Sequence, residues 1–583
     1  MRIIGPGTLL QRLEHRLQGP PISALVLALG LLLLCGWLFF YRLGSRDLWA
    51  PDEPRYAQVA REMIERSDWL VPYLNGELYT QKPMMYFWLE GAAGRLFGDV
   101  TPLAARLPSA LAATAIALGL FLWGTRRLGG AGRAWMAAAV LSTSAQFLWV
   151  ARFGQMDLVF AAFVFFSLIG GYETLRGQAA ARYRVLFYAA MAAATLTKGP
   201  VAVLLCWLGP LVACAARREW RSLARLKPQW GMPAVAAVVA AWYVPAVLST
   251  DGAYGGWEIL WKQTYRRAVH GYSHPKWFGY YLYDFPAIFL PWSLWLPAAW
   301  IFFQRRSGSK WHAFVGPTDA ERYLMGFFFA AFLFFSFSTE KRGNYLLPLF
   351  PAAAVYAAGA WPGLSRVADL LPGKVEAAYR WLFGFFALIL LLAAPGLLLL
   401  PGILPAAYRP DPGPLPFFSS LSLLAAVGFA WICRRRLWRT GWLGLVLLPC
   451  ALVPFQSHVV DPVVNPHKSA RYMCERLVEE RARGAEVISY IHVPPQFIYY
   501  SKGPIRIFRT PEEIVEHMRA HPRVLLLMEE PSYRRFQSQL EQAGRLIEKR
   551  GVGHRTMVLL SNYLNHKEPA ASEVEGTNGP PPG

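Results

Sequence analysis

Charged residues are scarce in this sequence, and acidic residues are scarcer than basic ones. Only 16% of the 583 residues are charged, with 37 acidic against 59 basic side chains, whereas a soluble domain carries about 25%. This deficit excludes an ordinary soluble globular protein. Instead, apolar runs near the ~20 residues needed to cross a hydrocarbon core recur through the first three quarters of the chain. The composition therefore indicates a polytopic α-helical membrane protein.

Cysteine is also sparse, and its arrangement argues against a sulfur-ligated metal site and against a disulfide in the last quarter of the chain. The six cysteines show no CxxC motif or paired spacing, which argues against a sulfur-ligated metal. They lie mostly within apolar runs, as small buried hydrophobic residues do. Only one of them follows residue 456, so the last quarter of the chain has no internal disulfide. The six are Cys35, Cys206, Cys214, Cys433, Cys450 and Cys474.

The apolar runs predict about 13 membrane spans. The first run, Ile22–Tyr41, is too long for a signal peptide and lacks an A-x-A-like cleavage site, so we expect a retained signal-anchor helix. Around "LTKGP" the residues also suit one kinked helix instead of two spans. The remaining spans are predicted at residues 102–123, 134–150, 156–173, 185–198, 200–216, 230–248, 283–303, 323–338, 345–361, 381–400, 418–433 and 441–456.

The net charge of +22 is explained by membrane orientation. If the N-terminus is cytoplasmic, every second loop is cytoplasmic too, and those loops are basic, as in "TRRLGGAGR", "RREWRSLARLK" and "CRRRLWR". No recognisable nucleic-acid-binding module accompanies this charge, so we expect no nucleic-acid partner. An odd number of spans then carries the C-terminus to the extracytoplasmic side.

This topology divides the chain into three regions. Residues 1–456 are predicted to form the membrane domain, residues 457–566 an extracytoplasmic α/β domain, and residues 567–583 a disordered tail. The α/β prediction rests on strand-like runs such as "EVISYI" and "RVLLLM" that alternate with helical runs such as "PEEIVEHMRA". The domain has no phosphate-loop glycine pattern and no nucleophile elbow, which favours a supporting or gating role.

The extracytoplasmic loop at residues 42–101 is rich in charged, aromatic and turn-forming residues. Within it, Pro54–Arg66 and Lys82–Gly98 are predicted to form two short amphipathic helices on the bilayer surface. Asp52 and Glu53 precede the first helix, and Lys82 begins the second. The loop therefore brings charges of both signs to the membrane face.

Further polar residues fall at the extracytoplasmic ends of the predicted helices. Asp157 opens the fourth span, and Lys198 lies between the fifth and the sixth. The others are Arg266, Arg267, His270 and His274 in "YRRAVHGYSHPKWFGYY", and Glu340, Lys341, Arg342 and Tyr345 in "STEKRGNYLLP". Gathered at one face, these charges indicate a site for a phosphate-bearing ligand near the membrane surface.

Each residue alone also has a plainer explanation. Acidic residues such as Asp52 and Asp157 suit helix N-termini as caps, and Lys198 suits a snorkelling anchor. His274 suits an interfacial position, and Tyr345 suits the aromatic belt. A secondary transporter, which would place ionisable residues near the midplane, and a structural membrane protein also stay open. The joint pattern at one face, without an internal repeat, favours an enzyme.

Several stretches resemble a known family. "PDEPRYAQVAREM", "DWLVPYLNGELYTQKP", "MDLVF", "LTKG" and "NYLLPLFPA" resemble bacterial polyprenyl-phosphate-dependent glycosyltransferases of the GT-C fold. That family includes the 4-amino-4-deoxy-L-arabinose lipid A transferases, with the protein O-mannosyltransferases as more distant relatives. The resemblance implies an inverting transfer of a sugar from polyprenyl (undecaprenyl) phosphate to an extracytoplasmic acceptor, in a bacterial inner membrane with the site facing the periplasm. A lipid-linked donor also suits the topology, because nucleotide sugars stay in the cytoplasm.

The resemblance also assigns residues. Three acidic residues are expected to be catalytic: Asp52 matches the essential carboxylate of the first loop, Glu53 lies beside it, and Asp157 matches a second acidic position that faces the sugar. Four residues are expected to hold the donor phosphate, and four more to contact the substrate. They are Lys82, Arg267, Tyr345 and Lys198 for the phosphate, and Tyr79, Arg55, His274 and Lys341 for the substrate. No cofactor is required, because the sugar–phosphate bond supplies the driving force; a divalent metal ion is possible at the acidic pair but not required.

The acceptor determines the role of Asp52. A protein or glycan hydroxyl must lose a proton as it attacks, so Asp52 would be the general base. A lipid A phosphate is already ionised and needs no base. The chain has "PDEPRY" and "TEKRGNYLLP" where the aminoarabinose transferases have forms nearer "PDETRY" and "SKLPTYILP", so lipid A, a protein and a glycan stay open as acceptors.

Overall fold

The computed structural model describes residues 24–177, 180–254, 276–307, 315–316, 318–359 and 373–564. The chain forms two compact units. The first unit comprises Met1–Arg46, Val59–Tyr73 and Leu78–Val463, and the second comprises Asp47–Gln58, Leu74–Glu77 and Val464–Gly583.

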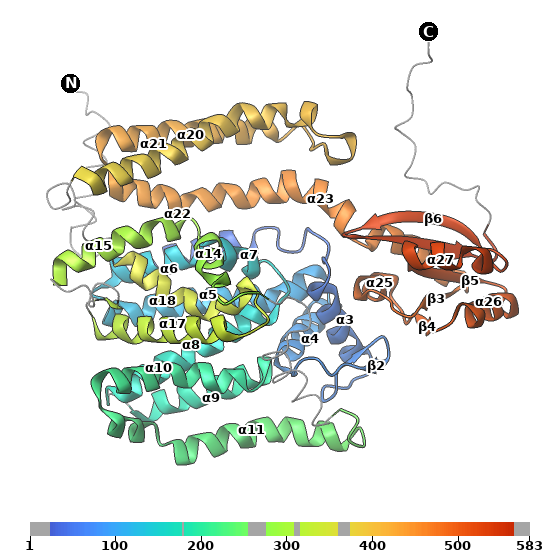
Figure 1. Cartoon of the computed structure of the whole chain (residues 1–583), viewed down its shortest axis with the longest axis horizontal. Helices are drawn as coiled ribbons and strands as arrows, with labels where there is room; N and C mark the ends of the chain where they lie inside the picture. Colours follow the sequence, from blue (N-terminus) through green and yellow to red (C-terminus); the bar gives the residue numbers. More distant parts are fainter. Residues whose placement is uncertain are drawn as a thin grey trace, which may run out of the picture. The chain divides into compact units, whose positions relative to one another are not determined.

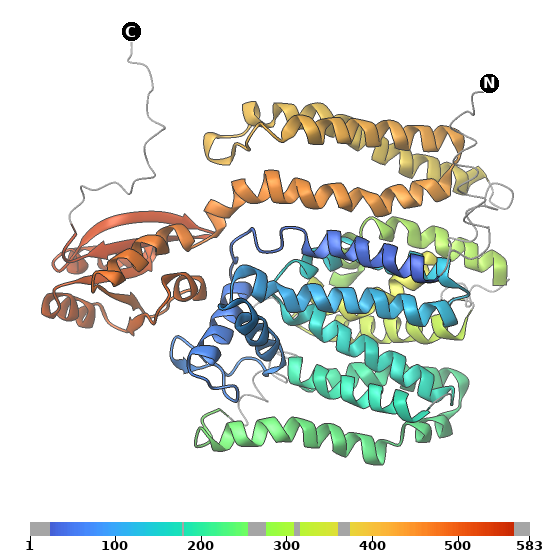
Figure 2. The ribbon, with the colours of Figure 1, turned by 180° about the vertical axis from the view of Figure 1, so that it is seen from behind.

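The first unit is built from apolar helices whose long axes run roughly parallel in both views (Figures 1 and 2). Seven helical segments among the described residues are long and apolar enough to cross a membrane. They are α5 (Pro102–Arg127), α8 (Met156–Leu175), α11 (Pro228–Leu248), α17 (Asp319–Phe337), α20 (Gly373–Ile403), α21 (Leu415–Arg435), and the run of α22 (Trp438–Phe455), η8 (Gln456–Val460) and α23 (Asp461–Lys468). The predicted class, a polytopic α-helical membrane protein, is confirmed.

The other six predicted spans fall on helices that are shorter, bent, broken or less apolar. Among the described residues, the number of helices that qualify as spans by length and hydropathy is therefore smaller than the predicted number of about 13. The clearest break lies at Thr143 and Ser144, where the pair predicted as one span bends by 70°. The elements concerned are α2 (Ala24–Cys35) with η1 (Gly36–Phe40), α6 (Ala131–Ser142) with α7 (Ala145–Ala151), α9 (Ala180–Lys198), α10 (Val201–Arg217), α14 (Tyr280–Ile288) with η4 (Trp292–Trp295) and α15 (Leu296–Ser307), and η5 (Gly343–Leu349) with α18 (Phe350–Ala358).

The stretch "LTKGP" separates two helices and does not kink a single one. α9 ends at Lys198, Gly199 adopts a φ of +80°, and α10 begins at Val201. A positive φ is the conformation that glycine adopts at least cost, and it commonly ends a helix. Lys198 therefore lies at the C-terminus of α9, where a cation suits the helix dipole.

Helices α8 and α9 approach each other closely. A Cβ atom added to Gly170 of α8 would lie 2.6 Å from the backbone nitrogen of Phe187 and 2.7 Å from the carbonyl oxygen of Tyr183, both in α9. Only a residue without a side chain allows this backbone contact. Because α9 returns antiparallel to α8, the beginning of α8 meets the end of α9 (Figure 1).

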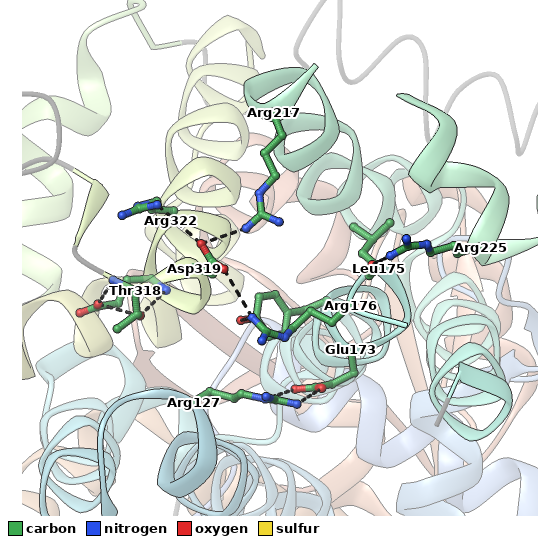
Figure 3. A network of polar contacts seen from close by, with 11 residues as sticks. Arg127, Glu173, Leu175, Arg176, Arg217, Arg225, Thr318, Asp319 and Arg322 are labelled. Atoms are coloured by element: carbon green, nitrogen blue, oxygen red, sulfur yellow. Dashed lines mark hydrogen bonds and ion pairs between the residues drawn. The ribbon is translucent and has the colours of Figure 1, made fainter. Parts of the chain in front are cut away.

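The far end of α8 carries an arginine-rich network (Figure 3). Glu173, whose side chain is 1% exposed, accepts hydrogen bonds from Arg127 of α5 at 2.5 and 2.8 Å and from Trp123 at 2.9 Å. Asp319, at the start of α17, forms ion pairs with three arginines. They are Arg217 at 3.0 Å, Arg176 at 3.4 Å and Arg322 at 3.6 Å. These are the helix ends for which the sequence predicts cytoplasmic loops.

The first loop contains two helices, as the sequence predicts, but the predicted helix starts are wrong: Asp52 and Glu53 form the first turn of the first helix, and Lys82 precedes the second. They are α3 (Asp52–Glu65) and α4 (Met85–Phe97), with the short strands β1 (Tyr73–Leu74) and β2 (Glu77–Leu78) between them. In the first unit, Gly91 and Gly94 of α4 receive the side chains of Met63 and Ile64 of α3. α3 is largely buried and exposes no continuous polar face, and its Arg61 is paired with Asp99 at 2.9 Å.

The second unit contains a five-stranded mixed sheet in the order β4-β3-β5-β7-β6. Its strands are β3 (Glu486–Tyr490), β4 (Arg506–Phe508), β5 (Val524–Glu529), β6 (Arg545–Val552) and β7 (Arg555–Ser561). β3 pairs in parallel with β4 and β5, whereas β7 pairs antiparallel with β5 and β6. β6 is absent from the sequence prediction because it is an edge strand in which four of eight residues are charged; such charges protect an edge but hide the apolar pattern.

Helices cover both faces of this sheet. Successive side chains of a strand point to opposite faces, so Leu525 and Leu527 pack with α24 and α25, while Val524 and Leu526 pack with α26 and α27. The helices are α24 (Arg471–Ala482), α25 (Pro495–Ser501), α26 (Pro511–Ala520) and α27 (Glu530–Leu540). The predicted layered α/β structure is present, and all six cysteines of the chain are free thiols.

Candidate active site

Asp157 and Lys198 form an ion pair in the first unit. The Lys198 Nζ donates to Asp157 Oδ1 at 2.5 Å, with side chains that are 15% and 13% exposed, respectively. Asp157 lies in the first turn of α8 and Lys198 is the last residue of α9. Each charge therefore has the sign that its helix end favours, and the close packing of α8 against α9 brings the two together.

Aromatic rings surround the ammonium group of Lys198. Its Nζ lies 5.0 Å from the ring centre of Phe160 and 5.4 Å from that of Tyr345. Both distances suit a cation–π contact. Tyr345 lies in η5, a 3₁₀ helix that packs against α8. Three predicted site residues, Asp157, Lys198 and Tyr345, thus meet at one place.

A chain of side-chain amides adjoins this cluster. Asn344 Nδ2 donates to Gln155 Oε1 at 2.9 Å, and Gln146 Nε2 donates to Asn344 Oδ1. Ser109 Oγ donates to the Gln155 carbonyl oxygen at 2.8 Å. Sequence reasoning missed these amides because neutral polar residues give no charge pattern. The only signal was their position: Gln155 lies two residues before Asp157, and Asn344 lies next to Tyr345.

A further carboxylate, Asp284, also escaped the sequence analysis. It belongs to α14, where Tyr280 Oη donates to its Oδ1 at 3.1 Å. A Cβ atom added to Gly343 would lie 3.3 Å from its Oδ2, so the carboxylate faces the turn that presents Asn344 and Tyr345. Its Oδ2 is buried and has no hydrogen-bond partner within the described part of the chain.

Lys341 has a structural position. Its side chain is buried, and its Nζ donates to the carbonyl oxygen of Lys276 at 3.0 Å and to that of Ser338. Desolvation lowers the pKa of this ammonium group. These bonds tie the segment before η5 to the chain at residue 276, so Lys341 orders the loop that carries Tyr345. Its predicted contact with the substrate stays a prediction.

The first-loop acidic pair belongs to the second unit. Glu53 is fully buried and accepts a hydrogen bond from the backbone nitrogen of Trp49 at 2.9 Å, which secures the entry to α3. Asp52 is more accessible, with a side chain that is 17% exposed, and its Oδ1 lies 3.7 Å from Arg55 Nη1. The predicted catalytic roles of Asp52 and Glu53 stay predictions.

Two other predicted residues, Tyr79 and Lys82, belong to the first unit. Tyr79 is buried with its ring edge-on to Phe87 at 5.8 Å, and Lys82 is half-buried in the segment that joins β2 to α4. Arg267 and His274, with Arg266 and His270, lie outside the described residues. The predicted roles of all these residues therefore stay predictions.

Side chains close enough together to bind one metal ion lie elsewhere in the described part of the chain. One group of histidine and carboxylate side chains, Glu486, His517 and His521, has potential ligand atoms within 4.8 Å of one another. Glu486 lies in β3, His517 in α26, and His521 directly follows α26; none belongs to the predicted catalytic set.

Parts of the chain are similar in sequence to known proteins. Residues 23–254 match the family described as dolichyl-phosphate-mannose-protein mannosyltransferase. The chain is 31% identical to the undecaprenyl phosphate-alpha-4-amino-4-deoxy-L-arabinose arabinosyl transferase of Edwardsiella ictaluri, over 54% of this chain and 56% of that relative, which is less than two thirds of its length. It is 30% identical to the transferase of the same name from Aeromonas hydrophila, over 68% of this chain and 72% of the relative.

The fold also matches a solved structure. The "Crystal Structure of ArnT from Cupriavidus metallidurans bound to Undecaprenyl phosphate" superposes with a TM-score of 0.73 at 19% identity, covering 94% of this chain and 99% of that one. At this identity the likeness concerns the fold. It confirms the expected GT-C-like architecture with a C-terminal α/β domain.

Proposed function

The chain belongs to the family of undecaprenyl phosphate-4-amino-4-deoxy-L-arabinose arabinosyl transferases, and on this basis we propose that it transfers a sugar from a polyprenyl-phosphate carrier to an extracytoplasmic acceptor. The transferred sugar is 4-amino-4-deoxy-L-arabinose or a close analogue, and the acceptor is a phosphate of lipid A. The enzyme lies in the bacterial inner membrane with its site facing the periplasm.

The observation that carries this proposal is the Asp157–Lys198 pair beside Tyr345. A cation held at the end of a membrane helix suits a phosphate whose lipid tail remains in the bilayer. As the bond between the anomeric carbon and the carrier oxygen breaks, its electron pair moves to the carrier phosphate. Lys198 stabilises that growing negative charge.

The neighbouring groups suit the other end of the reaction. Positive charge develops on the sugar as the bond breaks, and the carboxylate of Asp157 stabilises it while holding Lys198 in place. Amides such as Gln155 and Asn344 have the donors and acceptors that bind sugar hydroxyls. An oxygen of the acceptor phosphate then attacks the anomeric carbon from the opposite face, which inverts the configuration.

No cofactor enters this scheme. The sugar–phosphate bond supplies the free energy, and the ammonium group of Lys198 supplies the charge that a metal ion would provide. The partners are the lipid-linked donor, the lipid A acceptor and the bilayer. The runner-up acceptor is a hydroxyl of a protein or glycan, in which case Asp52 becomes the general base.

Mass spectrometry of lipid A tests the proposal. We expect a sugar-sized mass increment on lipid A phosphate in cells that carry the gene, and none in cells without it or with Asp157→Asn. Asp251→Asn is the matched control, because Asp251 is exposed in the turn after α11. Unmodified lipid A in cells shown to make both the protein and the donor would exclude this acceptor and favour the hydroxyl alternative.

A further inference from the structure

Three side chains of the second unit converge in a way that the transferase reaction does not use. His517 and His521 lie one helical turn apart at the end of α26, and Glu486 begins β3. His517 Nε2 lies 2.9 Å from Glu486 Oε2, and the two imidazole rings stack with centroids 4.0 Å apart. One atom from each residue lies within 4.8 Å of the other two.

The tautomer of His521 suits a metal ligand. Its Nδ1 lies 3.0 Å from the carbonyl oxygen of His517. Because a carbonyl oxygen only accepts, Nδ1 carries the proton, which leaves the lone pair of the neutral ring on Nε2. Metal-binding histidines are commonly fixed by such a bond from the other ring nitrogen.

The backbone under the cluster is anchored. Asn562, which directly follows β7, donates from Nδ2 to the carbonyl oxygens of Met518 at 2.6 Å and His521 at 2.7 Å, and its Oδ1 accepts from the Val524 nitrogen at 2.8 Å. This single side chain joins the end of α26 to the start of β5, the strand next to β3. The elements that carry the three ligands are therefore held together before any ion binds.

The surroundings leave a place for an ion at the surface. Glu486 Oε1 lies 4.0 Å from Arg506 Nη1, so the second carboxylate oxygen, Oε2, is the one that faces His517. His517 is buried, whereas the Glu486 side chain is 38% exposed and His521 is exposed. Water can therefore reach the exposed side and complete the coordination.

We propose that Glu486, His517 and His521 bind a divalent transition-metal ion of the zinc class, with water as the fourth ligand. Two imidazoles and a carboxylate suit Zn²⁺, whose bonds to them measure about 2.0–2.2 Å in a tetrahedral site. Rotation of the side chains draws the three ligand atoms around the ion. The metal takes the place of the proton on His517 Nε2, and the neutral imidazole keeps one proton, now on Nδ1. The site joins β3 to α26 and has a structural role.

Titration of the full-length protein in detergent tests this inference, after removal of any histidine tag and treatment with EDTA. We expect one equivalent of ZnSO₄ to bind, measured by isothermal titration calorimetry. Affinity should fall at least tenfold in His521→Ala and Glu486→Gln. Both variants preserve the buried His517, and Glu486→Gln keeps a hydrogen-bond acceptor for it.

His554→Ala is the matched control, because His554 is an exposed histidine of the same unit outside the cluster. It should bind zinc as the parent does. Co²⁺ in place of Zn²⁺ should give a visible d–d spectrum that His521→Ala loses. Binding that is absent in the parent, or equal in the parent and His521→Ala, would overturn the proposal and leave the cluster as a hydrogen-bonded helix end. Neither result bears on transferase activity, so the two proposals fail independently.

Discussion

The ammonium group of Lys198 and the carboxylate of Asp157 set the chemistry of the first unit at the scale of single residues. Held at 2.5 Å, the two charges largely cancel in the absence of a ligand. A ligand phosphate beside this pair would interact with the ammonium group of Lys198 as the carboxylate of Asp157 does. Because water has little access to the pair, the attraction between the phosphate and the ammonium group would be strong. Either residue without the other is an uncompensated charge at a membrane helix end.

Replacement of Lys198 tests this arrangement. We expect Lys198→Ala to lower kcat/KM about 100-fold, because a charge that stabilises the leaving phosphate is lost. Lys198→Arg should retain part of the activity, since the charge remains while the bulkier fork fits the aromatic surroundings less well. Steady-state kinetics with purified enzyme and a lipid-linked donor measure both. Wild-type rates in Lys198→Ala would remove Lys198 from the mechanism.

His492 makes the stability of the second unit depend on pH. Burial lowers its pKa, with Arg555 and Arg55 acting in the same direction and Glu529 opposing them. The unfolded chain therefore takes up the proton first, near pH 6.5, and stability falls as the pH drops below that value. We expect faster hydrogen exchange of the β3 and β5 amides at pH 5 than at pH 7, after correction for intrinsic rates.

His492→Gln is the control for this pH effect. It removes the titrating group, so the difference in corrected exchange between pH 5 and pH 7 should shrink. An undiminished difference in the variant would assign the acid sensitivity to other groups.

Ion pairs join the elements of the first unit at the end opposite the candidate site. Glu173 of α8 is buried and bound by Arg127 of α5, whereas Asp319 of α17 is 41% exposed among its three arginines (Figure 3). The two ion pairs should contribute differently to the free energy of unfolding because one is buried and the other is not. Breaking a buried pair leaves an uncompensated buried charge, whereas an exposed pair contributes little to stability.

A pair of variants separates these two cases. We expect Glu173→Gln to destabilise the protein by about 3 kcal/mol and Asp319→Asn by less than about 1 kcal/mol. Thermal unfolding in detergent compares the two side by side. Equal midpoints for the variants would mean that the Glu173 pair does not join α5 to α8.

At the scale of the whole molecule, the charge asymmetry predicts an orientation in the membrane. The basic helix ends are expected on the cytoplasmic side, and the Asp157–Lys198 end of α8 on the other side. A helix of 20 residues spans about 30 Å, so α8 alone connects the arginine network to the candidate site across the membrane.

Cysteine labelling measures this orientation. Gly413 lies between α20 and α21, and Arg435 is the last residue of α21; both are exposed. We expect a membrane-impermeant maleimide to label Gly413→Cys in intact spheroplasts, and Arg435→Cys only after permeabilisation. The parent protein, with its own six cysteines, is the background control. The reverse pattern would place the site in the cytoplasm.

The sequence by itself determined whatever depends on local composition. Apolar runs located the helices, and basic loops gave the expected orientation. Asp157 and Lys198 could be recognised because each is a charged residue at the end of an apolar run in the sequence. The strands β3, β4, β5 and β7 could be predicted because each falls on a short strand-like run, "EVISYI", "IRIFR", "RVLLLM" and "RTMVLL", next to a helix-forming segment.

Only the tertiary structure decided the contacts between distant segments. The 2.5 Å pairing of Asp157 with Lys198 depends on the antiparallel return of α9, and the amides Gln146 and Asn344 meet only because α7 and η5 pack together. The sequence did not reveal Asp284 or the edge strand β6 for a related reason: Asp284 is a single charged residue in an apolar helix, and half of the residues of β6 are charged. Local sequence records which residues can lie in lipid or water, whereas side-chain partners are set by the packing of elements far apart in the chain.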